Sequence, residues 1–174
     1  MSHPAAKWLT ATLVLAFAQG ACIESASARS TDRKQPMDIE AGQQKGSLDD
    51  RTPTVLSGGV TITQGTLNVA AERAVITTAG GDISRAVLTG RPAKLRQQLD
   101  DGTPMSAAAN EIDYNLRTEI VVFTGNVSIE QPRGSLSGQR VVYNMKTGDV
   151  TSGGQGNGRV KMRILPRNAP PGGG

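Results

Sequence analysis

The sequence predicts an all-β fold built from short antiparallel hairpins stacked on one another, and three observations support this. Apolar and polar residues alternate in many short runs, such as Val60-x-Ile62 and Val127-x-Ile129, and a period of two is typical of strands with one buried face. No stretch shows the sustained period of a long amphipathic helix. The chain also repeats itself at a fixed offset, which indicates a fold assembled from one structural unit.

The N-terminal residues predict export. Lys7 precedes an apolar run at residues 8–18, and small residues follow up to Ala28. This is the layout of a signal peptide, and the run is shorter than the roughly twenty apolar residues that span a membrane. We therefore expect residues 1–28 to be a signal peptide cleaved after Ala28. An uncleaved interfacial anchor and an acylated lipoprotein Cys22 are the alternatives.

Export would remove most nucleophilic and metal-binding chemistry from this protein. His3 and Cys22 are the only histidine and cysteine, and both lie in the predicted signal peptide. Ser-His-Asp or Cys-His catalysis and Cys or His metal sites need these side chains. The remaining acids lie mostly in turn-like contexts. We expect no enzymatic activity and no cofactor or metal, with a carboxylate hydrolase using Asp82 or Asp149 as the alternative.

The charge balance favours a phosphorylated amphiphile over nucleic acid. The chain carries a net charge of +4, which the predicted cleavage leaves unchanged. Binding of single-stranded nucleic acid requires aromatic stacking surfaces among the cations. Outside the signal peptide the aromatic residues are only Tyr114, Phe123 and Tyr143. We therefore expect no nucleic-acid partner.

The internal repeat sets the predicted architecture. Residues 58–96 match residues 125–163 without a gap at an offset of 67, with ten identities over 39 positions. A weaker half-period places a hydroxyl residue before Gly58, Gly90 and Gly125, and we predict a turn at each glycine. Hairpin tips are predicted at residues 80–82 and 147–149.

Stacked hairpins of this kind enclose an apolar interior within one domain, which we place at residues 29–166. The Pro- and Gly-rich residues 167–174 are predicted to form a disordered tail, and residues 29–35 to be loose. The alternation does not distinguish a filled core from an open groove. The predicted inward residues are Ile39, Val60, Ile62, Leu67, Val69, Leu95, Ile112, Tyr114, Leu116, Val127, Ile129 and Met162.

Several motifs in a fixed order carry a family resemblance. They are residues 35–41 (QPMDIEA), 56–60 (LSGGV), 63–67 (TQGTL), 91–93 (RPA) and 123–126 (FTGN). With these motifs the chain resembles the LptA/OstA-like family of periplasmic lipopolysaccharide transport proteins. The resemblance implies a twisted, open antiparallel β-jellyroll with a V-shaped cross-section, whose apolar groove takes up the acyl chains of lipid A.

The same resemblance implies partners, a location and site residues. It implies a periplasmic head-to-tail homo-oligomer that bridges an LptC-like inner-membrane protein and an LptD-like outer-membrane protein. We expect the free edges near residues 37–41 and 159–165. The polar segment 42–54 departs from the family, and part of it is expected to loop out. The lipid-binding residues implied by the resemblance are Met37, Ile39, Leu95, Tyr114 and Leu116.

Lys94 and Arg96 are candidates for contact with lipid phosphates, because guanidinium and ammonium groups pair with them. Two alternatives to lipopolysaccharide transport stay open. One is a structural β-repeat protein with a packed core, and the other is a carrier of a different amphiphile such as phospholipid.

Overall fold

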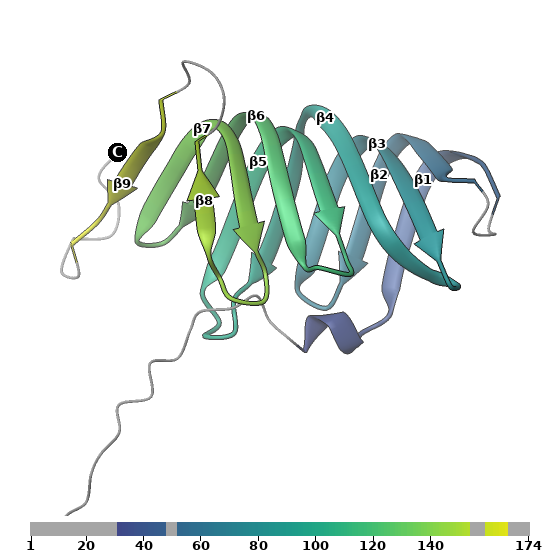
Figure 1. The fold of residues 1–174 in the computed structure, drawn as a ribbon, viewed down its shortest axis with the longest axis horizontal. Helices are drawn as coiled ribbons and strands as arrows, with labels where there is room; N and C mark the ends of the chain where they lie inside the picture. Colours follow the sequence, from purple (N-terminus) through teal and green to yellow (C-terminus); the bar gives the residue numbers. More distant parts are fainter. Residues whose placement is uncertain (1–30, 48–51, 154–158, 167–174) are drawn as a thin grey trace, which may run out of the picture.

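The computed structural model describes residues 31–47, 52–153 and 159–166, which form one nine-stranded antiparallel sheet preceded by a single 3-10 turn (Figure 1). The elements are η1 (Asp32–Lys34), β1 (Met37–Lys45), β2 (Thr54–Gln64), β3 (Leu67–Ala79), β4 (Asp82–Gln98), β5 (Pro104–Asn115), β6 (Ile120–Gln131), β7 (Gly134–Asn144), β8 (Val150–Ser152) and β9 (Lys161–Ile164). The prediction of an all-β fold is confirmed. Within these residues no helix is long and apolar enough to cross a membrane. The predicted signal peptide and C-terminal tail lie outside the described residues.

Each strand pairs with the next one along the chain, from β1 to β8, and β9 pairs with β7. Short turns join most neighbouring strands. The predicted hairpin tips at residues 80–82 and 147–149 are confirmed, because β3 turns into β4 at the first and β7 turns into β8 at the second. Within the polar segment 42–54, residues 42–45 continue β1 and β2 begins at Thr54. Residues 46–47 and 52–53 lie between the two strands, and 48–51 lie outside the described residues. The predicted edges agree with the described sheet, in which β1 pairs with β2 alone and β9 pairs with β7 alone. The short β8 is a further edge strand beside β9, since it also pairs with β7 alone.

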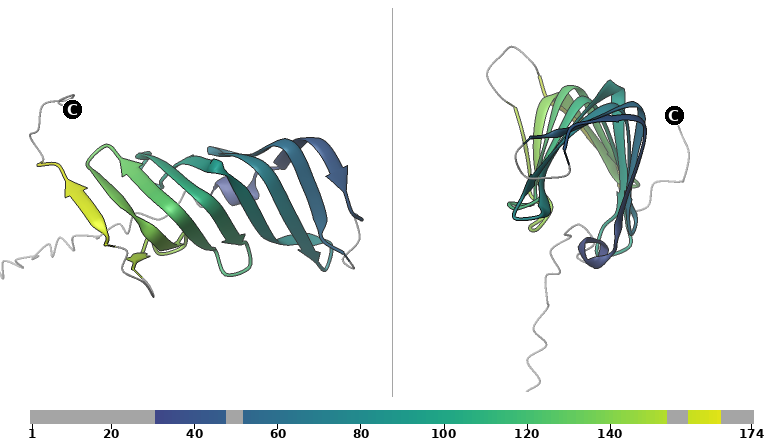
Figure 2. Two further views of the ribbon diagram at one scale, coloured as in Figure 1. Left: turned by 90° about the horizontal axis from the view of Figure 1, so that it is seen from above. Right: turned by 90° about the vertical axis from the view of Figure 1, so that its right-hand side faces the viewer.

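A line of register shifts crosses the sheet near the middle of its strands. Such bulges bend a strand and increase its twist. In the right-hand view of Figure 2, which looks along the direction in which the strands stack, the sheet curves into an arch that is open along one side. We call this line the crease. It runs between Ala41 and Gln43 in β1, Ser57 and Val60 in β2, Ala70 and Arg73 in β3, Thr89 and Ala93 in β4, Ala108 and Glu111 in β5, and Thr124 and Val127 in β6.

The crease corrects the prediction of a turn at Gly58, Gly90 and Gly125. All three lie within continuous strands, so the predicted short strands are wrong as well. Gly58 and Gly125 have φ angles of 80° and 78°, a left-handed conformation that disfavours side chains. A Cβ atom on Gly90 would lie 2.8 Å from the backbone nitrogen of Ala93. Glycine therefore allows these strands to bend without ending.

The crease divides the sheet into two walls that face each other. The first wall contains the strand halves that meet at turns 65–66, 99–103 and 132–133, together with β9. The second wall contains the strand halves that meet at turns 80–81, 116–119 and 145–149, together with β8. The tips of the two walls border the open side of the arch, which we call the mouth.

Because one sheet makes the whole described fold, its own concave face forms the core. Phe123, Ile112 and Val141 have no exposed surface, so much of the interior is filled by contact between the walls. Ile39 and Leu116 are half-buried against this core, whereas Met162 is 62% exposed on the edge strand β9. The other predicted inward residues are all buried: Val60, Ile62, Leu67, Val69, Leu95, Ile112, Tyr114, Val127 and Ile129.

The sequence repeat is a structural repeat. β2 and β3 correspond to β6 and β7, while the two ends of β4 correspond to the separate strands β8 and β9. The pairing of Ser135 with Arg163 reproduces that of Asn68 with Arg96, one repeat earlier. β9 thus occupies the position that the second half of β4 holds in the first unit.

Candidate functional site

A pocket of about 350 Å³ opens between the tips of the two walls. Leu99, Met105 and Ile129 line it from the first wall, and Tyr143 lines it from the second. Arg133 stands at its rim, on the turn between β6 and β7. Its volume is at the lower end of the range of roughly 300–1,000 Å³ that small-molecule pockets occupy. Polar residues line it as well, namely Asp101, Thr103 and Gln131. The pocket therefore combines an apolar floor with charges of both signs, which suits a molecule with an apolar chain and a polar head.

The two tyrosines of the second wall are neutral at physiological pH. Burial raises the pKa of Tyr143 to about 12, and the carboxylate of Asp100 on the first wall adds to this shift. Burial also raises the pKa of Tyr114, while the charge of Arg33 opposes the rise. Both rings therefore act as large apolar surfaces that carry one hydroxyl each.

One polar side chain points into the apolar interior. Gln97 is 6% exposed and is the single buried polar residue among those that the structure describes. It pairs with Met105 across the β4–β5 ladder, and Leu95 and Leu99 flank it on the same face of β4. Its Nε2 atom is buried and has no hydrogen-bond partner in the described part of the chain.

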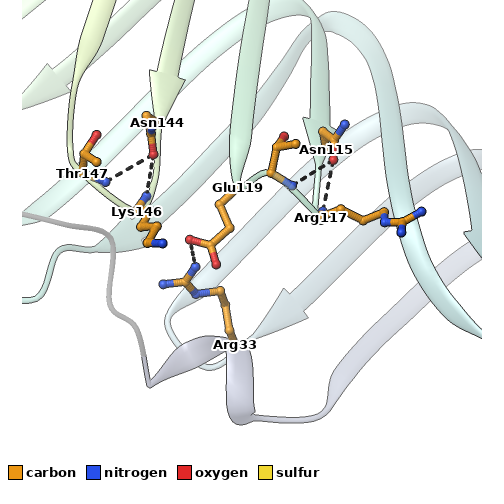
Figure 3. A network of polar contacts seen from close by, with 8 residues as sticks. Arg33, Asn115, Arg117, Glu119, Asn144, Lys146 and Thr147 are labelled. Atoms are coloured by element: carbon orange, nitrogen blue, oxygen red, sulfur yellow. Dashed lines mark hydrogen bonds and ion pairs between the residues drawn. The ribbon is translucent and has the colours of Figure 1, made fainter.

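The residues before β1 connect the two walls across the mouth. Thr66 on the first wall donates a hydrogen bond from its Oγ1 to the carboxylate of Asp32. Next to Asp32, Arg33 forms an ion pair with Glu119 on the second wall (Figure 3). We call residues 31–35 the strap. The prediction of a loose segment is wrong here, because the strap contains η1 and is held at both of its sides.

The five predicted lipid-binding residues all belong to the interior face. Leu95 and Tyr114 are buried, and Met37, Ile39 and Leu116 are half-buried against the core. Leu95 lies on the first wall, whereas Tyr114 and Leu116 lie at the tip of the second. The structure therefore spreads these residues along the interior instead of gathering them at one point, and their contact with lipid stays a prediction.

Lys94 and Arg96 lie on the opposite face from the interior. They flank the buried Leu95 on β4 and are exposed, so alternation directs their side chains to the outer surface. A phosphate attached to chains inside the arch would lie at the mouth and not on this surface. The hypothesis that these two cations contact such a phosphate is therefore not supported.

Three residues at the mouth were not predicted from the sequence: Leu99, Met105 and Tyr143. Leu99 continues the buried series of residues 93, 95 and 97, but this series is out of phase with the buried residues 86 and 88 at the start of the same strand. Because the buried face changes from even to odd positions at the crease, simple alternation does not extend along the whole of β4. Tyr143 could have been found through the repeat, because it corresponds to the buried Ile76.

The two carboxylates considered for hydrolysis do not lie together in one site. Asp82 and Asp149 are exposed at different hairpin tips, and Asp149 accepts a hydrogen bond of 2.6 Å from the Thr147 hydroxyl. Among the described residues, no group of three or more His, Cys, Asp or Glu side chains is arranged to hold a metal ion.

Comparisons with known proteins agree on one family. Residues 38–149 match the family described as LptA/(LptD N-terminal domain) LPS transport protein. The lipopolysaccharide export system protein LptA of Escherichia coli K12 is 31% identical over 160 residues, which cover 91% of this chain and 86% of that protein. LptA of Haemophilus influenzae is also 31% identical over 160 residues, covering 90% of this chain and 88% of that protein.

A solved structure has the same fold. LptH of Pseudomonas aeruginosa, the LptA-homologous periplasmic component of its lipopolysaccharide transport device, superimposes with a TM-score of 0.70. The match covers 78% of this chain and 99% of LptH at 22% sequence identity. The open, bent sheet is thus the architecture that the sequence resemblance implied.

Proposed function

This chain belongs to the family of LptA and LptD N-terminal-domain lipopolysaccharide transport proteins, and we propose that it binds lipopolysaccharide in the periplasm and carries it from the inner to the outer membrane. The observation that carries this proposal is the concave apolar face of a sheet that is open along one side. That face is suited to acyl chains, and the mouth is suited to a polar head group that stays in water.

Transport physics favours such a carrier. Exposing one acyl chain of about twelve carbons to water costs on the order of ten kcal/mol, at ~0.8 kcal/mol per methylene. Lipid A has several such chains, so free diffusion through an aqueous compartment is strongly unfavourable. Buried aliphatic side chains such as Leu95 and Ile129 offer surroundings that remove this cost.

The filled parts of the interior can open because the sheet itself joins the walls only at the crease, and the strap is the connection across the mouth in the described structure. No second sheet or helix covers the concave face in the described part of the chain. We propose that acyl chains enter from the mouth pocket and separate the walls, replacing contacts between side chains with contacts to lipid. Such a replacement of one apolar contact by another is close to neutral in free energy.

The two free edges support a head-to-tail bridge. β1 and β9 each have one unpaired side, whose N–H and C=O groups can pair with a strand from another molecule. We propose that β9 of one copy pairs with β1 of the next. By the family resemblance, an LptC-like and an LptD-like domain would occupy the two ends of the bridge.

Photo-crosslinking tests the groove. A photo-reactive amino acid at Leu95 or at Tyr114 should form adducts with lipopolysaccharide, because both side chains face the interior. Lys94 is the matched control, since it neighbours Leu95 but faces the outer surface. Adducts should be absent at Lys94, and excess phospholipid should not prevent adducts at the interior positions.

Two results would contradict the proposal. Labelling at Lys94 alone, or at none of these positions, would indicate a structural β-repeat protein whose core remains packed. Complete loss of lipopolysaccharide adducts in the presence of phospholipid would indicate that another amphiphile is the cargo.

A further inference from the structure

The same hydrogen-bonded turn occurs twice on the second wall, as NLRTE at residues 115–119 and NMKTG at residues 144–148, and only the fifth position differs in chemical character. In the turn after β5, the side-chain oxygen of Asn115 accepts hydrogen bonds of 3.1 Å from the backbone N–H groups of Arg117 and Thr118. In the turn after β7, Asn144 accepts equivalent bonds of 3.0 and 3.2 Å from the residues two and three positions later (Figure 3). The fifth residue of each turn has a left-handed backbone, and it is Glu119 in one turn and glycine in the other.

Glutamate is an unfavourable choice for this position. Gly148 adopts a φ of 75° without steric conflict, whereas Glu119 holds a φ of 58° with a Cβ atom present. Strained residues of this kind persist where the surrounding structure holds them, and they are frequent at ligand-binding positions. The turn itself does not need a carboxylate, as the second copy demonstrates.

The carboxylate of Glu119 has a specific partner. It forms an ion pair with Arg33, and the two contacting atoms are both shielded from solvent. Arg33 is held over the mouth because the neighbouring Asp32 is bound to Thr66 on the first wall. The side chain of Arg33 is 27% exposed, and its charge opposes the rise in the pKa of Tyr114, so the guanidinium lies where the apolar interior meets the solvent.

A guanidinium binds phosphate and carboxylate oxygens through the same arrangement of N–H donors. Building on the proposed function, we infer that Arg33 binds a phosphate group on the head of the lipid whose acyl chains occupy the groove, and that Glu119 takes the place of this phosphate when the groove is empty. Lipid binding would then exchange one anion for another on Arg33. The exchange would free Glu119 and release the strap from the second wall.

Two substitutions with opposite expected effects test the inference. Glu119→Gly recreates the backbone of the Gly148 turn without the competing carboxylate, so it should bind lipid A more tightly than the wild type, by severalfold. Arg33→Gln removes the phosphate ligand, and its affinity should fall about tenfold, the loss expected for one charge-assisted hydrogen bond. The probes are two fluorescently labelled, detergent-solubilised lipids, namely lipid A with both phosphates and its dephosphorylated form. Purified protein is titrated into each lipid, and the fluorescence anisotropy of the label measures binding.

The dephosphorylated lipid provides the internal control, because it lacks the group that Arg33 binds. Both substitutions break the same ion pair, so they should change the affinity for this lipid in the same direction and to the same extent. Arg117→Gln provides the control for charge. Arg117 is exposed on the same turn as Glu119, and its substitution removes one positive charge without touching the strap. It should change the affinity for either lipid by less than twofold.

Each opposing result has a distinct meaning. Equal losses in Arg33→Gln and Arg117→Gln, or no gain in Glu119→Gly, would overturn the role of the strap while leaving the proposed function intact. Competition by inorganic phosphate at the same concentration as the lipid would overturn the assignment to a lipid head group. If the wild type bound neither form of lipid A, the proposed function would fail together with this inference.

Discussion

Gln97 places a buried polar side chain in the otherwise apolar interior. Its buried Nε2 atom has no hydrogen-bond partner in the described structure, and such a donor costs about 1–3 kcal/mol. Gln97→Leu should therefore raise the free energy of unfolding by about that amount. Urea denaturation of the wild type and the variant measures the difference.

The neighbouring Gln98 is a matched control, because it is exposed on the other face of β4. Gln98→Leu should change the free energy of unfolding by no more than about 0.5 kcal/mol. A loss of stability in Gln97→Leu would indicate that the amide has a partner in solution and would contradict this account.

Alternation predicts which residues face inward only on one side of the crease at a time, that is, within one half of a strand. Alternation correctly identified Val60 and Ile62 on β2, as well as Leu95 on β4. It missed Ala86 and Leu88, because the buried face of β4 changes from even to odd positions where the strand crosses the crease. The register shift between Thr89 and Ala93 reverses the meaning of the pattern, and alternation alone does not reveal where such a shift occurs.

At the scale of the strand, the crease determines the shape of the sheet, and β4 tests its role. A Cβ atom on Gly90 would lie 2.8 Å from the nitrogen of Ala93, a backbone atom that cannot move aside without shifting the strand. Gly90→Ala should destabilise the fold by about 1–3 kcal/mol through this overpacking. Thermal unfolding should record the loss as a lower midpoint.

Gly138→Ala is the control for this change. Gly138 lies opposite Val127 in the register of β6 and β7, next to the crease, but an added Cβ would meet only a Val160 side-chain atom at 3.8 Å. Its stability should stay within about 1 kcal/mol of the wild type, since the substitution also reduces the entropy of the unfolded chain. Equal losses in both variants would show that glycine matters here for reasons other than the bend.

Hairpin tips were predictable from their Gly-Asp sequences, but the bends were not. Residues 80–82 and Gly58 both read as turns in the sequence, and only the first is one. A glycine in the left-handed conformation serves equally at a hairpin tip and at a bulge inside a strand. The choice between them depends on whether the flanking residues find partners across the sheet, which is a property of the whole fold.

At the scale of the whole molecule, the repeat predicted the stacking of the hairpins but not the strap. The offset of 67 residues relates β2 and β3 to β6 and β7, as the structure has them. The strap joins Arg33 to Glu119, two residues far apart in the chain that no repeat or motif connects. Their ion pair exists because the bent sheet brings the tip of the second wall close to the residues that precede β1.

The repeat also predicts that a partner strand can be added beside β9. Leu95 of β4 is 3% exposed, whereas Met162, its equivalent on β9, is 62% exposed, and among the described strands β9 pairs with β7 alone. Ile164 on the same strand is 73% exposed. If β1 of a second copy pairs with β9, these side chains become buried. The mass of the wild type measured by light scattering should then rise with protein concentration.

Ile164→Lys should weaken this association by about tenfold or more, because it would bury a charge without a partner in the contact between copies. Thr124→Lys is the control, since it adds the same charge at an exposed position of the central strand β6. It should leave the association unchanged, and neither variant should lower the unfolding midpoint by more than a few degrees. A single monomeric mass of the wild type at every concentration would contradict the head-to-tail bridge, even if the groove binds lipid.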